Sequence, residues 1–449
     1  MDAGTCAWSR HRRCGGRSQP RQPALLLAAT TARCSQPRRA ALLLAATAAR
    51  TAARSHDGPR GILAVTEPTE GAIEAVRPTR AEVDLDAIRH NVRVLAEVAG
   101  DAMVCAVVKA DGYGHGAIEV AGAALQAGAR WLAVALVEEG EVLRAAGIDA
   151  PILLLSEPVG QADVAGRRAA VRRMLDADLT PSVATTAFAD VLGEVADDPV
   201  ASHLLVDTGM GRIGCRPEAV ADLLAHPALD VTGAWTHFAR ADEDVDTTEE
   251  QRRRWEPVVA QVRAARPRAI IHAANSAGLL RHPDARFDMV RTGIALYGLS
   301  PAPSVTATSF GLHQALTLRT AVSFTKYVVA GTPLSYGHTW SAPRDGWVAT
   351  LPIGYADGVP RSTSNRIEVV IGGRRCPQIG RVTMDQVLVF TGDHQPAVGD
   401  ETLLLGGDPA DADDPSLFVS VDEWAAAAET IAYEIPCQLT ARVPRLHLH

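Results

Sequence analysis

The sequence predicts a (β/α)8 barrel of the TIM type followed by a mostly antiparallel β domain. Between residues 77 and 311, short apolar runs alternate about eight times with alanine-rich segments of helical periodicity. That alternation is typical of a parallel sheet covered by helices on both faces. From residue 312 to 449 the runs are short and alternating, with Gly, Pro and Asp between them, which indicates antiparallel strands. A doubly wound parallel sheet is the second interpretation of the first half.

The barrel half begins with a helix that we expect Asp86 to cap. Its apolar positions, Ile88, Val92, Leu95 and Val98, follow a period close to 3.6 residues. The predicted strands are 102–109, 131–136, 151–155, 179–183, 203–207, 231–236, 269–273 and 286–290. The predicted helices between them include 115–127, 217–225 and 248–264, and a short helix near 421–431 interrupts the β domain.

Composition limits the function classes. Residues 1–76 carry 11 of the 44 basic and 5 of the 52 acidic residues, so the rest of the chain is acidic and nucleic acid is not an expected partner. No apolar run reaches the roughly 18 residues of a membrane span. The seven cysteines show no metal-ligand spacing, which predicts no metal site and indicates reduced thiols, as in the cytoplasm.

Residues 1–76 do not resemble a folded domain. SQPRQPALLLAAT (18–30) recurs almost unchanged as SQPRRAALLLAAT (35–47), in a segment rich in Arg and Ala. Two copies this short cannot stack into a solenoid. We expect a disordered extension or a translated upstream region from a mis-assigned start. A transit peptide is the alternative interpretation.

Lys109 is the most informative single residue. It ends the apolar run of MVCAVVKADGYGHG, and the chain has only one other lysine, Lys326, among its 44 basic residues. Arginine cannot deprotonate and attack a carbonyl, so a lysine at the end of a buried strand indicates amine chemistry. The glycine-rich stretch that follows predicts a flexible turn that brings the Tyr113 hydroxyl close. A structural lysine that reaches solvent from a strand end is the alternative.

Further polar residues follow other predicted strands. They are Arg212 in VDTGMGRIG, His237 in WTHFARADED, Asn275 and Ser276 in HAANSAG, and Arg291 in MVRTGIALYG. The carboxyl ends of parallel barrel strands share one rim, so we expect these side chains to converge there. Ser276 and the helix behind it could receive an anion. Taken singly, each residue could equally be a packed side chain or a helix cap.

Nine motifs in order cover the chain from about Pro78 to Arg445: AVVKADGYGHG, DTGMGRIG, THFARADE, ANSAG, RTGIALYG, SYGHTW, GYADGVPR, VTMDQ and YEIPC. Together they resemble the alanine racemase family of fold-type III pyridoxal-phosphate enzymes. The resemblance implies a barrel that binds pyridoxal 5'-phosphate, a head-to-tail homodimer in the cytoplasm, and conversion of L-alanine to D-alanine for peptidoglycan.

The resemblance also implies two catalytic bases, Lys109 and Tyr336. Lys109 would hold the cofactor covalently, and Tyr336 would come from the other subunit. Racemisation removes a proton from one face of Cα and returns one to the other face, so two bases must flank the substrate.

The remaining roles are implied in the same way. Arg291 would face the pyridine nitrogen, and His237 would bridge Arg291 and Tyr336. The cofactor-binding residues would be Tyr113, His237, Asn275, Ser276, Arg291, Gly293, Ile294 and Tyr433, of which Tyr113, Ser276, Tyr433 and the amides of Gly293 and Ile294 would hold the phosphate. The substrate carboxylate would bind Arg212 and the backbone of Met384. The access channel would be lined by Tyr355, Arg381 and Asp242.

Four positions depart from the family pattern. Leu205 stands where many members have a lysine, often carbamylated, that orients the arginine corresponding to Arg212. The others are Arg240, Thr292 and Thr383. Leu205 and Arg240 leave open a broader amino-acid or serine racemase. Two more distant alternatives are a decarboxylase of basic amino acids and a non-catalytic pyridoxal-phosphate carrier, although the β domain argues against a carrier.

Overall fold

The computed structural model describes residues 76–158, 163–407 and 417–449. All of them belong to one compact unit, Ile73–His449. Of the predicted extension 1–76, only Val76 lies within the described residues. None of the helices in the described ranges is long and apolar enough to cross a membrane.

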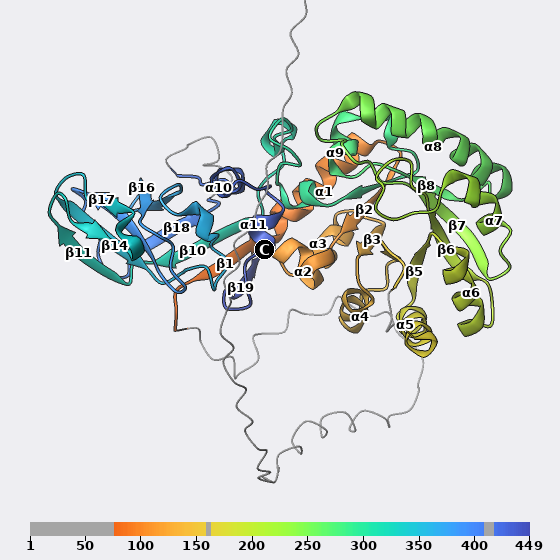
Figure 1. Cartoon of the computed structure of the whole chain (residues 1–449), viewed down its shortest axis with the longest axis horizontal. Helices are drawn as coiled ribbons and strands as arrows, with labels where there is room; N and C mark the ends of the chain where they lie inside the picture. Colours follow the sequence, from red (N-terminus) through yellow and green to blue (C-terminus); the bar gives the residue numbers. More distant parts are fainter. Residues whose placement is uncertain (1–75, 159–162, 408–416) are drawn as a thin grey trace, which may run out of the picture. The chain divides into compact units, whose positions relative to one another are not determined.

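Eight parallel strands close into a barrel, which confirms the (β/α)8 prediction (Figure 1). They are β2 (Met103–Val107), β3 (Trp131–Val134), β4 (Ile152–Leu154), β5 (Leu179–Val183), β6 (Val200–Leu205), β7 (Leu229–Trp235), β8 (Ile270–His272) and β9 (Met289–Thr292). β9 pairs with β2 to close the ring, with Arg291 opposite Cys105. Arg291 therefore lies within the last strand, whereas the predicted strand ended at residue 290. The barrel strands bury nearly all their side chains because helices cover the outside.

The helices alternate with the strands, and α4 to α8 surround the barrel in Figure 1. They are α1 (Leu85–Ala99), α2 (Lys109–Gly114), α3 (Ala117–Gln126), α4 (Val137–Ala145), α5 (Val164–Asp176), α6 (Thr186–Val195), α7 (Val220–Leu224), α8 (Val245–Ala265) and α9 (Ser276–Arg281). The 3-10 helices of the barrel half are η1 (Pro217–Ala219), η2 (Pro283–Ala285), η3 (Ile294–Tyr297) and η4 (Ala307–Phe310).

Asp84, not Asp86, caps α1, so the predicted cap is wrong by two residues. Asp84 is the last residue of strand β1 (Arg80–Asp84), and its extended backbone lets the carboxylate accept the Ala87 amide at 2.9 Å. Asp86 lies within the first turn and pairs with Arg89 at 2.7 Å. The strand end fixes which of the two aspartates has the extended conformation that a cap requires.

A pair of substitutions tests this cap. Asp84→Ala is expected to lower the free energy of unfolding by about 1 kcal/mol, because the Ala87 amide loses its acceptor. Asp86→Ala removes an exposed ion pair and is expected to cost about 0.5 kcal/mol or less. Denaturant unfolding of both variants measures the difference, and equal losses would contradict the assignment.

The β domain is a nine-stranded sheet in the order β11-β14-β17-β16-β15-β18-β10-β1-β19. Its strands are β10 (Leu316–Ala321), β11 (Phe324–Val328), β14 (Gly346–Leu351), β15 (Glu368–Ile371), β16 (Arg374–Ile379), β17 (Val387–Gly392), β18 (Glu401–Leu405), β19 (Arg445–Leu448) and β1. Every pair is antiparallel except β1 with β19, so the predicted strand arrangement is confirmed. A separate two-stranded sheet pairs β12 (Pro333–Leu334) with β13 (Trp340–Ser341), with η5 (Tyr336–His338) between them.

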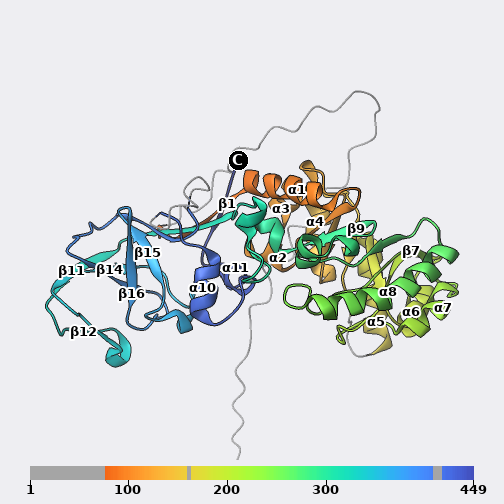
Figure 2. The ribbon, with the colours of Figure 1, turned by 90° about the horizontal axis from the view of Figure 1, so that it is seen from above.

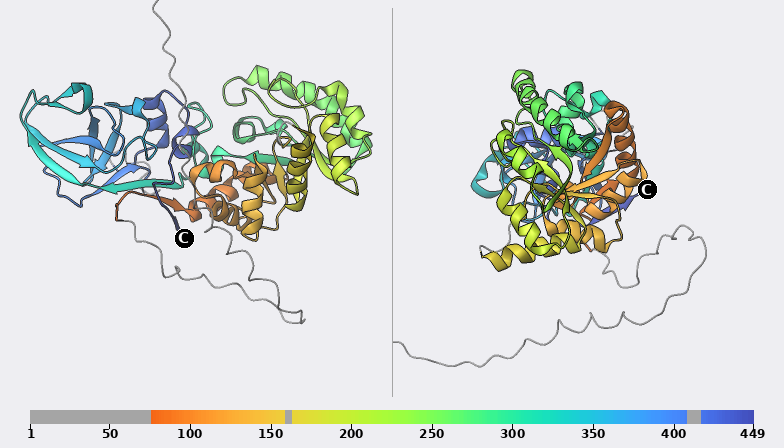
Figure 3. Two further views of the ribbon diagram at one scale, coloured as in Figure 1. Left: turned by 60° about the horizontal axis from the view of Figure 1, so that its bottom comes forward. Right: turned by 90° about the vertical axis from the view of Figure 1, so that its right-hand side faces the viewer.

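Strand β1 joins this sheet although it precedes the barrel in sequence. It pairs with β10 on one side and β19 on the other, and its orange colour sets it apart from the blue strands in Figure 1 and the left view of Figure 3. The predicted domain boundary at residues 311 and 312 does not account for this strand, and that boundary stays a prediction. The short helix expected near 421–431 is α10 (Val421–Ala428), which packs against η6 (Arg361–Thr363) and α11 (Glu434–Cys437) (Figure 2).

Candidate active site

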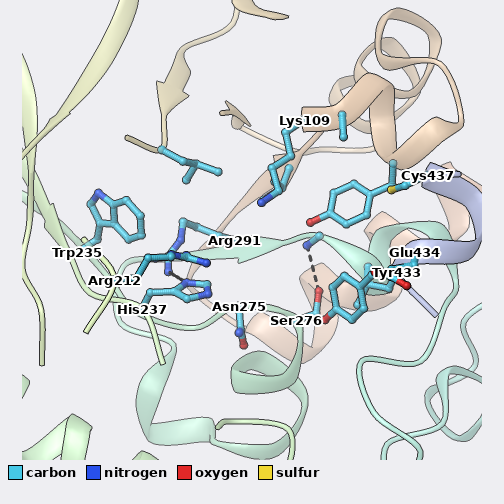
Figure 4. Close-up of a pocket in the computed structure, with 16 residues that line it drawn as sticks. Lys109, Arg212, Trp235, His237, Asn275, Ser276, Arg291, Tyr433, Glu434 and Cys437 are labelled. Atoms are coloured by element: carbon cyan, nitrogen blue, oxygen red, sulfur yellow. Dashed lines mark hydrogen bonds between the residues drawn. The ribbon is translucent and has the colours of Figure 1, made fainter. Parts of the chain in front are cut away.

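A cavity of about 430 Å³ lies at the carboxyl ends of the barrel strands. Ten of the twelve candidate site residues line it (Figure 4): Lys109, Tyr113, Arg212, His237, Asn275, Ser276, Arg291, Gly293, Ile294 and Tyr433. The remaining two, Tyr336 and Met384, do not line it and are 72% and 52% exposed. The convergence expected from the strand ends is therefore present, whereas the two residues from β-domain turns lie elsewhere.

Lys109 leaves the barrel through a left-handed turn. Ala110, Asp111, Gly112 and Tyr113 have φ values between 52° and 60°, where only glycine is unstrained. Left-handed backbone costs roughly 1–2 kcal/mol for each residue with a side chain. Neighbouring segments contact the turn in this conformation, and the flexibility expected from its glycines stays a prediction.

The C-terminal segment makes several of those contacts. Arg445 Nε donates to the Gly114 carbonyl at 3.0 Å, and His447 Nε2 donates to the His115 carbonyl at 2.8 Å. A Cβ atom on Gly114 would lie 2.2 Å from the carbonyl oxygen of Pro436. Only glycine permits this approach, so the turn is packed directly against α11.

Burial lowers the pKa of Lys109, and the nearby Arg212 guanidinium lowers the pKa further. The Glu139 carboxylate and Cys437 act in the opposite direction and are outweighed. A lower pKa increases the fraction of neutral amine, which is the form that attacks a carbonyl or accepts a proton.

Arg291 is a buried cation with uncharged partners. Its side chain donates to His272 Nδ1 at 3.0 Å and to the carbonyl oxygens of Thr236 and Ala273 at 2.9 Å each. It also lies 4.4 Å from the centre of the Trp235 ring. Burial lowers the pKa of Arg291 to about 10, which leaves it charged at neutral pH.

His237 lies beside Arg291 as expected, with Nδ1 3.2 Å from the guanidinium. Burial and the charge of Arg291 lower the pKa of His237 to about 3, so the ring is neutral. Arginine has no acceptor, so Nδ1 receives the hydrogen bond and the ring proton is on Nε2. That proton is available to a further acceptor.

Two histidines behind Arg291 were not predicted. His272 Nε2 lies 2.9 Å from His203 Nδ1, and both rings are fully buried. Because His272 accepts from Arg291 at Nδ1, its proton is on Nε2 and is donated to His203. The signal was present in the sequence, since His272 opens the HAANSAG motif and ends β8.

The opposite side of the cavity carries hydroxyl groups. Ser276 Oγ accepts the amides of Gly293 at 3.0 Å and Ala295 at 3.2 Å. Figure 4 shows Ser276 and Tyr433 on this side, Arg212 and Arg291 on the other, and Lys109 pointing into the space between them. Asn275 caps α9 by accepting the Gly278 amide at 2.8 Å. The side chain of Asn275 is therefore engaged in the helix, and the Gly293 amide already has a partner within the chain.

Comparison with known proteins identifies the fold family. The N-terminal domain of alanine racemase matches residues 83–301, and the C-terminal domain of alanine racemase matches residues 315–447. The chain belongs to the alanine racemase family. Members of this family are isomerases, and this chain is accordingly an enzyme of that class.

Individual alanine racemases align with this chain along almost their whole length. The enzyme of Symbiobacterium thermophilum is 46% identical over 390 residues, covering 84% of this chain and 98% of the relative. That of Frankia casuarinae is 42% identical, covering 82% and 96%. The solved alanine racemase from Streptomyces coelicolor A3(2) superposes with a TM-score of 0.77 at 38% identity, covering 84% and 99%.

The departures from the alanine racemase pattern have different surroundings. Leu205 is buried, and within the described residues the Arg212 guanidinium makes no hydrogen bond or ion pair. Arg240 pairs with Glu243 at 3.3 Å and Asp244 at 3.1 Å, so nearby acids balance its charge. Thr292 donates to the Cys105 carbonyl at 3.4 Å, and Thr383 donates to the Gln386 carbonyl at 2.7 Å. Arg212 itself lines the cavity, so its guanidinium stands there without such a partner.

Proposed function

We propose that this protein interconverts L-alanine and D-alanine with pyridoxal 5'-phosphate, using Lys109 and the Tyr336 of a second copy as the two bases. The observation that carries the proposal is the cavity in which Lys109 faces Arg291 and Arg212 in a chain of the alanine racemase family. We further propose that the product D-alanine supplies peptidoglycan synthesis in the cytoplasm.

The side chains around the cavity fit pyridoxal phosphate at three points. Lys109 offers a partly buried amine for the aldehyde, and Arg291 offers a cation for the pyridine nitrogen. Tyr113, Ser276 and Tyr433 offer hydroxyls for the phosphate, next to the first amide of η3 at Ile294. When bound, the cofactor supplies the electron sink that weakens the Cα–H bond.

The residues of this chain perform the proton transfers. Lys109, with its lowered pKa, accepts a proton from Cα on its face or returns one there. Arg291 donates its hydrogen bonds to uncharged acceptors and stays charged at neutral pH, and its cation would keep the pyridine nitrogen of a bound cofactor unprotonated. Arg212, with the backbone of Met384, is proposed to orient the substrate carboxylate.

The second base requires a second subunit. Tyr336 lies in η5 between β12 and β13, outside the cavity that holds Lys109. Exposed apolar side chains also lie in the β domain: Phe324, Tyr327, Val329 and Met384. Apolar exposure of this kind is typical of an interaction surface, and a head-to-tail dimer would bring Tyr336 of one copy to the cavity of the other.

Substrate breadth is tested by comparing amino acids in one assay. We expect L-alanine to be racemised at least about tenfold faster than L-serine, because a small pocket discriminates by roughly 1–3 kcal/mol. Comparable rates would favour the broad-specificity alternative that Leu205 and Arg240 motivate. Release of CO2 from a basic amino acid would contradict the proposed reaction itself.

A further inference from the structure

The turn that follows Lys109 is held at one point by Glu139, which does not line the cavity. The Glu139 carboxylate, in the first turn of α4, accepts the Ala110 amide with Oε1 at 2.6 Å. Ala110 directly follows Lys109 and is the first of the left-handed residues. This hydrogen bond therefore holds the residue after Lys109, as the bond from the Val108 amide to the Ala133 carbonyl holds the residue before it.

The other oxygen of the same carboxylate is bound to a different segment. Oε2 accepts the amides of Ala135 at 2.9 Å and Leu136 at 3.1 Å, where the chain passes from β3 into α4. Oε2 thus binds the two amides that directly precede α4. Oε1 is directed entirely to the turn after β2. One carboxylate thus joins the ends of two neighbouring barrel strands.

Glu139 also acts on Lys109 through its charge. Within the described residues it forms no ion pair, so no cation neutralises it. The groups that act on the Lys109 amine are Arg212 after β6, Glu139 in α4 and Cys437 in α11. Burial and Arg212 lower the pKa of Lys109, while Glu139 and Cys437 raise it. Glu139 is the carboxylate among them.

We propose that Glu139 is a positioning residue for Lys109, whose carboxylate fixes the Ala110 amide and thereby the direction in which the lysine leaves β2. The importance of that direction rests on the proposed function, in which Lys109 is a base. The contact and the charge do not depend on it. Glutamine at this position keeps the size but offers one acceptor oxygen in place of two, so the turn or the start of α4 loses its acceptor.

The two lysines of the chain allow a direct test. The full chain, freed of cofactor, is treated with acetic anhydride over a range of pH, and acetylation at Lys109 relative to Lys326 is measured by mass spectrometry. In Glu139→Gln we expect Lys109 labelling near neutral pH to rise about three- to tenfold, because a lower pKa leaves more neutral amine. Glu138→Gln is the matched control, since Glu138 pairs with Arg173 and does not touch the turn. Equal labelling in both variants would overturn the electrostatic part of the proposal.

Glu139→Asp separates geometry from charge, because aspartate keeps the charge and shortens the reach. We expect its Lys109 labelling to be within about twofold of the unmodified chain. In the same variant, exchange of the substrate α-proton on the face that Lys109 serves should become about tenfold or more slower, relative to exchange on the face that Tyr336 serves. Unchanged exchange in Glu139→Asp would overturn the positioning role, and circular dichroism confirms that each variant is folded. If the proposed function were wrong, the unmodified chain would not racemise alanine, yet the labelling difference between Glu139→Gln and Glu138→Gln would persist.

Discussion

Lys109→Ala is expected to abolish alanine racemisation and the visible absorbance of the lysine-bound cofactor. The substitution removes both the covalent attachment point and one of the two proposed bases. Loss of a base alone lowers a rate by roughly 10²–10⁴-fold, so a fall at the upper end of this range or beyond is expected. Absorbance spectra after addition of pyridoxal phosphate, together with the racemisation rate, provide the measurement.

Lys326→Ala is the matched control. Lys326 lies on β11 of the β domain and is the only other lysine in the chain. Its removal should leave both the spectrum and the rate unchanged. Visible absorbance that survives in Lys109→Ala, or disappears in Lys326→Ala, would show that the cofactor is attached elsewhere.

Tyr336→Phe is expected to slow α-proton exchange unequally in the two enantiomers of alanine. The slowing should be on the order of 10²–10³-fold greater for one enantiomer than for the other. The phenol is proposed to serve one face of Cα, while Lys109 serves the opposite face and is retained. Exchange of each enantiomer in heavy water, followed by nuclear magnetic resonance, measures the asymmetry. Equal loss for both enantiomers would contradict the two-base mechanism.

The origin of Tyr336 is tested by mixing two inactive variants. If each site combines Lys109 of one copy with Tyr336 of another, mixed dimers of Lys109→Ala and Tyr336→Phe chains contain one intact site. Random exchange of subunits would then restore about a quarter of the original activity, since about half of the dimers are mixed. Tyr327→Phe is the control, because it removes only a hydroxyl from another exposed tyrosine of the β domain and keeps the ring on the proposed interaction surface, so it should retain activity. No recovery on mixing would contradict a shared site.

The fold could be predicted because its patterns are local. Apolar strands alternating with helices indicated the barrel, and short alternating runs indicated the antiparallel sheet. Strand β1 shows the limit of this reasoning. Its pairing partners in β10 and β19 lie more than 200 residues away, and no local pattern specifies them.

The candidate site was predictable where it depends on strand ends. Lys109, Arg212, His237 and Ser276 converge because parallel strands end at one rim. The conformation of the turn after Lys109 was not predictable, because distant contacts impose left-handed backbone on residues such as Ala110. Its glycines indicated freedom, whereas the close approach of Pro436 leaves room for glycine alone at position 114.

The contact between the lysine turn and the end of the chain has a consequence for biosynthesis. The turn is made early on the ribosome, but Arg445, which holds its Gly114 carbonyl, is added 331 residues later. Domains generally fold in the order in which they are synthesised, so the barrel can collapse before this support exists. The nascent chain therefore gains this support for its lysine turn only after residue 445 has been added, and removal of residues 445–449 would take the support from a barrel that is otherwise complete.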